Sequence, residues 1–145
     1  PTGREAEIDR VATLANDGLA AGHDVVVYTS RRLLGAAAGT DALGVGRQVS
    51  SALVGIVRRI AVTPRFVVAK GGITSSDVAT QGLGVRKALV VGQILPGVPV
   101  WRLGPESRFP GAPYVVFPGN VGDTGSLARV VEILGREKSA TALTG

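Results

Sequence analysis

Apolar residues recur every three or four positions in three stretches of the chain, which predicts amphipathic helices over residues 5–21, 43–61 and 124–134. The second stretch has the most regular pattern, and it places Arg58 and Arg59 on its polar side. Residues 138–145 continue the pattern poorly and are expected to form a frayed end. A further short helix is predicted to begin near Ser75 or Ser76.

Short runs of apolar and β-branched residues between these helices predict strands at residues 25–29, 66–69, 88–91, 98–103 and 114–117. Runs without polar alternation are typical of strands that are buried on both faces of a parallel sheet. Helices that alternate with such strands predict an α/β fold, a layered fold in which helices flank a parallel or mixed β-sheet.

Two segments are less defined by the pattern. Residues 31–40 are rich in glycine and alanine and are compatible with a short helix, a loop or a flap, and residues 92–97 are expected to form a turn between strands. We find no repeat and no internal linker, so residues 1–145 are predicted to form one domain.

The composition excludes several kinds of chemistry. The chain has no cysteine and a single histidine, His23, so it lacks a disulfide framework, a thiolate metal site, a thiol nucleophile and a multi-histidine site, and we assign no metal ligands. Its apolar runs are shorter than a membrane span and it opens without a signal core, so a soluble cytoplasmic protein with no membrane partner is expected.

The first residue carries information of its own. The chain contains no methionine and opens at Pro1. This indicates either a piece of a longer protein or removal of the initiator methionine.

The net charge of +5 raises the possibility of a nucleic-acid partner, but the distribution of the charges does not favour one. No basic run exceeds two residues, and six aromatic side chains are too few for a platform that stacks bases. Residues 42–105 contain Asp77 as their only acid and several basic residues. Such a field also suits an anionic small molecule.

Two glycine turns follow predicted strands. Gly71 and Gly72 come after the second strand and precede Thr74, Ser75 and Ser76, and residues 119–125 follow the last strand. Glycine lets the backbone approach a ligand closely, and hydroxyls with the free N–H groups of a helix start bind phosphate. Ligands of open α/β sheets bind at the carboxyl ends of strands, so two such turns suit one nucleotide.

An alternative is that both turns only reverse the chain, as capped glycine turns do in many α/β proteins. Neither turn matches the Walker pattern or the dinucleotide fingerprint. Nearby side chains also have two interpretations each, and the structural one is favoured for Asp77 and for the two aromatic residues. Lys70 is a phosphate ligand or a solvated strand end, Asp77 holds magnesium or stabilises a helix start, and Trp101 and Phe117 stack on adenine or belong to the core.

Three motifs, in this order and spacing, resemble one known family: AKGGITSSDVA at residues 69–79, GQILPGVPVW at 92–101 and VFPGNVGD at 116–123. The family is the four-carbon acid sugar kinases, some once labelled type III effector-like proteins, and the resemblance is to their C-terminal nucleotide-binding domain. It is clear from residue 66 to residue 125 and weaker before that.

The resemblance implies a set of nucleotide-binding residues. Gly71, Gly72, Ile73 and Thr74 would contact the phosphates of ATP, and Gly119 would line the same nucleotide, with Mg²⁺ accompanying ATP. Many relatives carry an acid where this chain has Ile73, so the contacts here are expected from the backbone. The segment at 92–99 would form a wall of the pocket or a structural turn.

The resemblance also implies a function. Family members are ATP-dependent kinases of threonate, erythronate or oxo-tetronate, in which an N-terminal domain binds the sugar acid and supplies the base. Residues 1–145 are expected to correspond to the other domain, so the catalytic residues are unknown and this chain alone is expected to be inactive. The alternatives are a non-catalytic module that binds an anionic metabolite and, less favoured, a nucleic-acid binder. Assembly as a homo-oligomer stays open.

Overall fold

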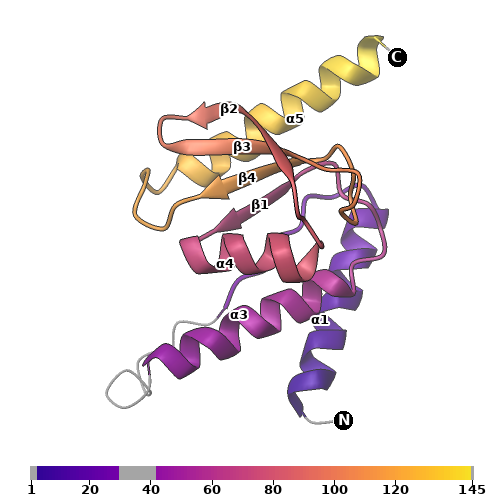
Figure 1. The fold of residues 1–145 in the computed structure, drawn as a ribbon. Coiled ribbons are helices and arrows are strands. Elements are labelled where there is room, and N and C mark those ends of the chain that lie inside the picture. The colour runs from indigo at the N-terminus through magenta and orange to yellow at the C-terminus, as the bar shows by residue number, and fades with distance from the viewer. Residues whose placement is uncertain (1–2, 30–41, 145) are drawn as a thin grey trace.

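A mixed sheet of four strands, with helices on both faces, forms the centre of the fold in the computed structural model (Figure 1). The structure describes residues 3–29 and 42–144. The predicted α/β fold with a mixed sheet is confirmed. The elements in chain order are α1 (Gly3–Ala20), α3 (Ala42–Arg58), β1 (Val67–Lys70), α4 (Gly72–Asp77), the π-helical turn η1 (Val78–Gly82), β2 (Ala88–Leu95), β3 (Val98–Leu103), β4 (Pro113–Phe117) and α5 (Ser126–Thr144).

The strand order across the sheet is β1-β4-β3-β2. β1 and β4 run parallel, with Val67 opposite Tyr114 and Lys70 opposite Phe117, whereas β3 is antiparallel to both β4 and β2. Because β1 and β4 point the same way, they end at one edge of the sheet. Figure 1 shows that α4 and the loop to α5 both begin at this edge.

Strand residues alternate between two cores. On one face Tyr114 and Ala69 pack with Leu83 and residues of α1, and on the other face Val115 and Phe117 pack under α5. All four strand residues are nearly inaccessible to solvent. The period of two along β4 therefore buries this strand on both sides, as its continuous apolar run predicts.

The strand predicted at residues 25–29 is wrong. Within the described residues this segment does not pair with the sheet, and Val26 and Tyr28 are 65% and 85% exposed. Val25 alone packs against a core cluster. The β-branched run has strand propensity, but propensity does not form a strand without a neighbour to pair with. Residues 31–40, which the pattern left open, lie outside the described residues.

Three element boundaries also differ from the prediction. α4 begins at Gly72, before Ser75, and α5 continues to Thr144 through the expected frayed end. β2 extends to Leu95, so the predicted turn at 92–97 shrinks to Pro96 and Gly97. Irregularities in pairing near Gly92 let β2 bend while it stays bonded to β3. No helix within residues 3–29 and 42–144 has the length and hydropathy to cross a membrane.

Asn16 joins α1 to the chain that leaves α3. Its Nδ2 donates to the carbonyl oxygen of Arg59 at 2.9 Å, and its Oδ1 accepts from the amides of Ala61 at 2.8 Å and Val62 at 3.2 Å. One side chain thus satisfies three backbone groups at a helix end, where carbonyls and amides lack regular partners.

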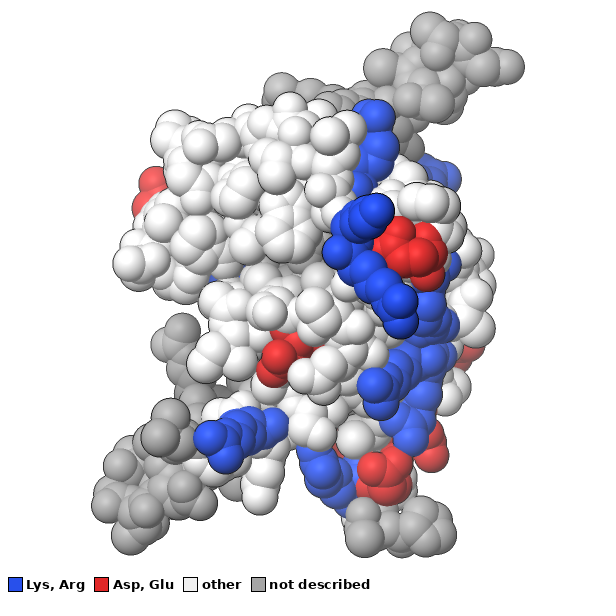
Figure 2. All heavy atoms as spheres, viewed as in Figure 1, with Lys and Arg blue, Asp and Glu red and all other residues white. Residues whose placement is uncertain are grey.

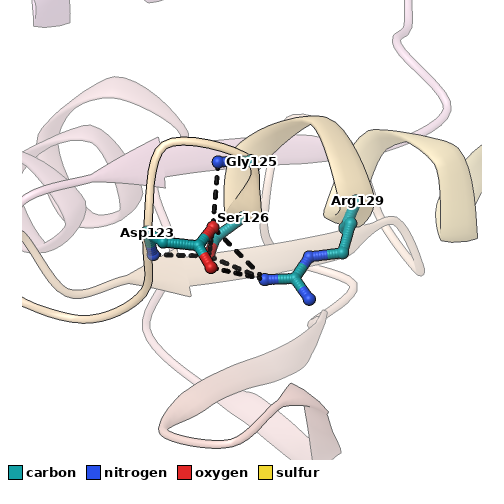
Figure 3. A network of polar contacts seen from close by, with 4 residues as sticks. All are labelled: Asp123, Gly125, Ser126 and Arg129. Atoms are coloured by element: carbon teal, nitrogen blue, oxygen red, sulfur yellow. Dashed lines mark hydrogen bonds and ion pairs between the residues drawn. The ribbon is translucent and has the colours of Figure 1, made fainter.

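A polar network holds the turn that leads into α5 (Figure 3). The carboxylate of Asp123 accepts from the amide of Gly125 at 2.9 Å and from the hydroxyl of Ser126 at 3.2 Å, and it pairs with Arg129 at 3.3 Å. In return the Oγ of Ser126 accepts from the amide of Asp123 at 2.8 Å. This reciprocal capping fixes the turn relative to the helix.

We expect Asn16→Ala to lower the free energy of unfolding by about 1–3 kcal/mol, because it leaves three backbone groups without their partner. Urea unfolding followed by circular dichroism measures the change. Asn120→Ala, at an exposed position, is the matched control and should cost little. Equal effects of the two substitutions would show that the Asn16 bonds do not hold α1 in place.

The amide of Gly125, then the hydroxyl of Ser126 and the charge of Arg129, lower the pKa of Asp123 below its usual value. A carboxyl whose pKa is lowered in the folded state stabilises the fold above its unfolded pKa, and this contribution is lost as the pH falls through the folded pKa. The stability difference between the wild type and Asp123→Asn should therefore be largest near neutral pH and shrink below about pH 4. Thermal unfolding between pH 3 and pH 7, with Asp24→Asn as control, measures it. A difference that does not change with pH would contradict this role.

Candidate functional site

The two glycine turns predicted from the sequence meet at the edge where β1 and β4 end. The amide of Gly71 donates to the carbonyl oxygen of Phe117 at 2.8 Å, which extends the pairing of the two strands by one bond. A Cβ added to Gly119 would lie 3.9 Å from the Cα of Gly71. The structure thus places Gly71 and Gly119 side by side.

The third motif reaches the same edge through the hairpin of β2 and β3. A Cβ added to Gly97 at the hairpin tip would lie 3.5 Å from Val121 in the second turn. The amide of Gly97 donates to Gln93 at 3.2 Å, which holds the tip closed. The contact between Gly97 and Val121 was not predicted, and the antiparallel pairing of β3 with β4 is what produces it.

The first turn is built on an unusual backbone conformation. Gly71 has φ 107° and ψ 142°, a region that side chains other than glycine enter only with strain. A Cβ added to Gly72, in contrast, would meet no atom within 4 Å. Since Gly71 provides no side-chain cap, the first amides of α4 have no side-chain acceptor, and the space beside Gly72 is open to a ligand.

The side chains of the first motif have different roles. Thr74 is half-buried, and its Oγ1 would lie 3.8 Å from a Cβ on Gly71, so it faces the turn. Ile73 is 72% exposed and has no polar atom in its side chain. The hydroxyl of Ser75 does not join Thr74, because Ser75 is buried and donates to the carbonyl oxygen of Ala69 at 2.9 Å. The predicted cluster of hydroxyls is therefore wrong at Ser75.

A buried tyrosine ties α4 to the sheet. The hydroxyl of Tyr114 donates to the carbonyl oxygen of Ser75 at 2.7 Å. Burial raises the pKa of Tyr114 above its ordinary alkaline value, so the hydroxyl stays protonated and keeps donating even in mildly alkaline solution. Two buried hydrogen bonds, one from Ser75 and one from Tyr114, thus hold the first glycine turn and α4 against the sheet.

The other candidates divide between site and scaffold. Lys70 ends β1 directly before the first turn, and its Nζ lies 4.5 Å from the centre of the Phe117 ring. Phe117 is 1% exposed, and Trp101 stacks on Tyr114 with centroids 5.9 Å apart, so both aromatics predicted as possible adenine contacts pack within the fold.

One of the two predictions for Asp77 placed it at a helix start, and this prediction is wrong. Asp77 ends α4, where its carboxylate accepts from the hydroxyl of Ser50 at 2.6 Å and from Gln81 at 3.3 Å. The bond to Ser50 joins α4 to α3, so Asp77 has a structural role. In the part of the chain that the structure describes, no group of three or more His, Cys, Asp or Glu residues could hold a metal ion.

The basic residues lie mostly away from the glycine turns. Figure 2 shows that on this face lysine and arginine gather along the right-hand margin, whereas the left-hand end, where β1 and β4 end in Figure 1, is largely uncharged. Several of them hold the fold: Arg58 donates to the carbonyl oxygen of Gln81, and Arg59 pairs with Glu5 and Asp9. On this face, the positive charge predicted for residues 42–105 is therefore not concentrated at the site.

Two shallow hollows of about 420 and 370 Å³ lie elsewhere. The larger is lined by Thr80, Val85, Arg86 and Glu106, where the Glu106 carboxylate accepts the amides of Arg86 and Lys87 at 2.7 and 3.0 Å. Neither hollow includes a residue of the two glycine turns. The candidate site is thus an open edge formed by backbone, not one of these hollows.

The chain matches the family model described as nucleotide-binding C-terminal domain over residues 1–127. It is 32% identical to 3-oxo-isoapionate kinase from Paraburkholderia graminis, in a match that covers 81% of this chain and 28% of that protein. The chain therefore spans less than a third of the length of this relative.

Two solved structures are also similar. A Salmonella typhimurium LT2 protein provisionally described as a tRNA synthase matches with TM-score 0.63 and 26% identity, over 87% of this chain and 30% of that one. A domain of unknown function from Bordetella bronchiseptica, with bound citrate and in a domain-swapped dimer, matches with TM-score 0.52 and 26% identity, over 59% and 22%. All three motifs of the resemblance lie within the matched region, and the chain belongs to the nucleotide-binding C-terminal domain family of the four-carbon acid sugar kinases.

Proposed function

We propose that this chain is the ATP-binding domain of a kinase that phosphorylates a four-carbon sugar acid of the threonate, erythronate or oxo-tetronate type. The observation that carries the proposal is the meeting of Gly71 and Gly119 at the carboxyl ends of two parallel strands. Ligands of open α/β sheets bind at such an edge.

The backbone of the first turn would hold the phosphates. The amides of Gly72, Ile73 and Thr74 are the first donors of α4, and the open space beside Gly72 suits a phosphate oxygen. Gly119 would lie against the same nucleotide because a side chain there would project toward Gly71. ATP supplies the phosphoryl group, and the chain positions it.

Magnesium would enter with the nucleotide. Ile73 has no oxygen ligand to offer, and the carboxylates of Asp77 and Asp123 already accept hydrogen bonds from neighbouring side chains. Mg²⁺ commonly keeps several water molecules and binds through phosphate oxygens, which fits a site built from backbone.

The substrate and the rest of the enzyme are part of the proposal. The relative named as a 3-oxo-isoapionate kinase supports phosphoryl transfer to a sugar acid, and its greater length is consistent with a further domain that binds the acid and supplies the base. Homo-oligomeric assembly is supported by the domain-swapped dimer of the Bordetella neighbour. The alternative is a non-catalytic module that binds an anionic metabolite at the same edge.

Gly72→Val tests the site without disturbing the fold. An added Cβ lies more than 4 Å from every atom beyond the chain neighbours of Gly72 and the backbone of its own helix, so we expect unchanged thermal stability. The affinity for Mg-ATP and ADP should be at least about tenfold weaker, because the valine side chain would fill the phosphate position. Isothermal titration calorimetry measures both nucleotides. Gly3→Val is the matched control, since Gly3 is also the first residue of a helix and also has no neighbour within 4 Å of an added Cβ.

Polyphosphate, a sugar phosphate and transfer RNA complete the titration. The proposal requires saturable binding of ATP and ADP that Gly72→Val weakens and Gly3→Val does not. Binding of the sugar phosphate without nucleotide would favour the metabolite module. Binding of transfer RNA alone, with a steep dependence on salt, would contradict both.

A further inference from the structure

Lys70 lies at the junction of the two glycine turns. It is the last residue of β1, it precedes Gly71, and it stands opposite Phe117 in the parallel pairing with β4. Ala69 faces the core that includes Tyr114, so the alternation along the strand turns Lys70 to the other face of the sheet, the face that Phe117 shares with α5.

The ring of Phe117 connects Lys70 to the second turn. The Nζ of Lys70 lies 4.5 Å from the ring centre, within the range of a cation–π contact. A Cβ added to Gly122 would lie 3.4 Å from the Cζ of the same ring. Since Phe117 is buried, its ring is a fixed support that borders both the ammonium group of Lys70 and Gly122 of the second turn.

The charge of Lys70 has no carboxylate partner within the described residues. Among these described residues, the basic partners of the ion pairs are Arg10, Arg59 and Arg129. Asp123, the acid of the second turn, pairs with Arg129 and caps α5 (Figure 3). An ammonium group therefore lies beside two backbone turns, and none of the carboxylates that the structure describes in residues 3–29 and 42–144 pairs with it.

From this arrangement we infer that Lys70 binds an outer phosphate of the nucleotide and so favours a triphosphate or diphosphate over a monophosphate. The inference rests on the proposed function. In this arrangement the backbone amides of the first turn bind one phosphate. The ammonium group of Lys70, on the opposite face of the sheet edge, binds the next phosphate of the same nucleotide. Lysine suits this role as a compact point charge with three donors.

Lys70→Met tests the inference. It keeps the length and apolar stem of the side chain and removes the charge, so the affinity for Mg-ATP and ADP should fall about 10- to 100-fold, the range expected for a charged hydrogen bond. The affinity for AMP should change less than about threefold, and Lys70→Arg should restore part of the loss. Lys87→Met is the matched control, because it removes the same charge where β2 begins, beside Glu106. Calorimetry with AMP, ADP and Mg-ATP measures all four proteins, and thermal unfolding checks that each is folded.

The outcomes separate this inference from the proposed function. If the wild type binds ATP and ADP, but Lys70→Met weakens them no more than Lys87→Met does, the role of Lys70 is wrong and the nucleotide site stands. An equal loss of affinity for AMP, ADP and ATP would also overturn the inference. Such a loss is what a merely structural effect produces, because it does not depend on the number of phosphates. If the wild type binds no nucleotide, the proposed function fails and the role of Lys70 fails with it.

Discussion

The parallel pairing of β1 with β4 is the constraint on which the rest of the site depends. Parallel strands end at the same edge, so the loops that follow them start side by side. Here the pairing continues for one more bond, from the amide of Gly71 to the carbonyl oxygen of Phe117. Two segments separated by almost fifty positions in the chain thereby become one surface, and the antiparallel β3 adds its hairpin tip to it.

Buried polar groups keep this surface in one shape. Ser75 and Tyr114 bond to the backbone at the end of β1 and in α4, and the Asp123 network caps α5. Buried hydrogen bonds of this kind are costly to break, so they favour a turn that is preorganised before a ligand arrives. A domain that binds through backbone amides needs such support, because amides cannot adjust as side chains do.

The sequence predicted the candidate site better than it predicted the individual roles within it. Gly71 and Gly119 were expected at one ligand and lie side by side, although their contact with nucleotide stays a prediction. The sequence predicts Ser75 as a phosphate ligand, because hydroxyls after a glycine pair suit phosphate, and it leaves Asp77 open to magnesium or to a structural role at a helix start. Both bond to other parts of the fold instead, and residue type alone does not tell which direction a side chain takes.

What the sequence determined by itself was the class of the fold, the helices α1, α3 and α5, and the identity of the family, because periodicity and motif order are local properties of the chain. The tertiary structure alone decided which apolar runs became strands. Residues 88–95 form backbone hydrogen bonds with β3, whereas residues 25–29 pair with no strand among the described residues. It also decided that Lys70 stands over Phe117. Strand pairing and side-chain placement depend on neighbours distant in sequence, and no local pattern contains them.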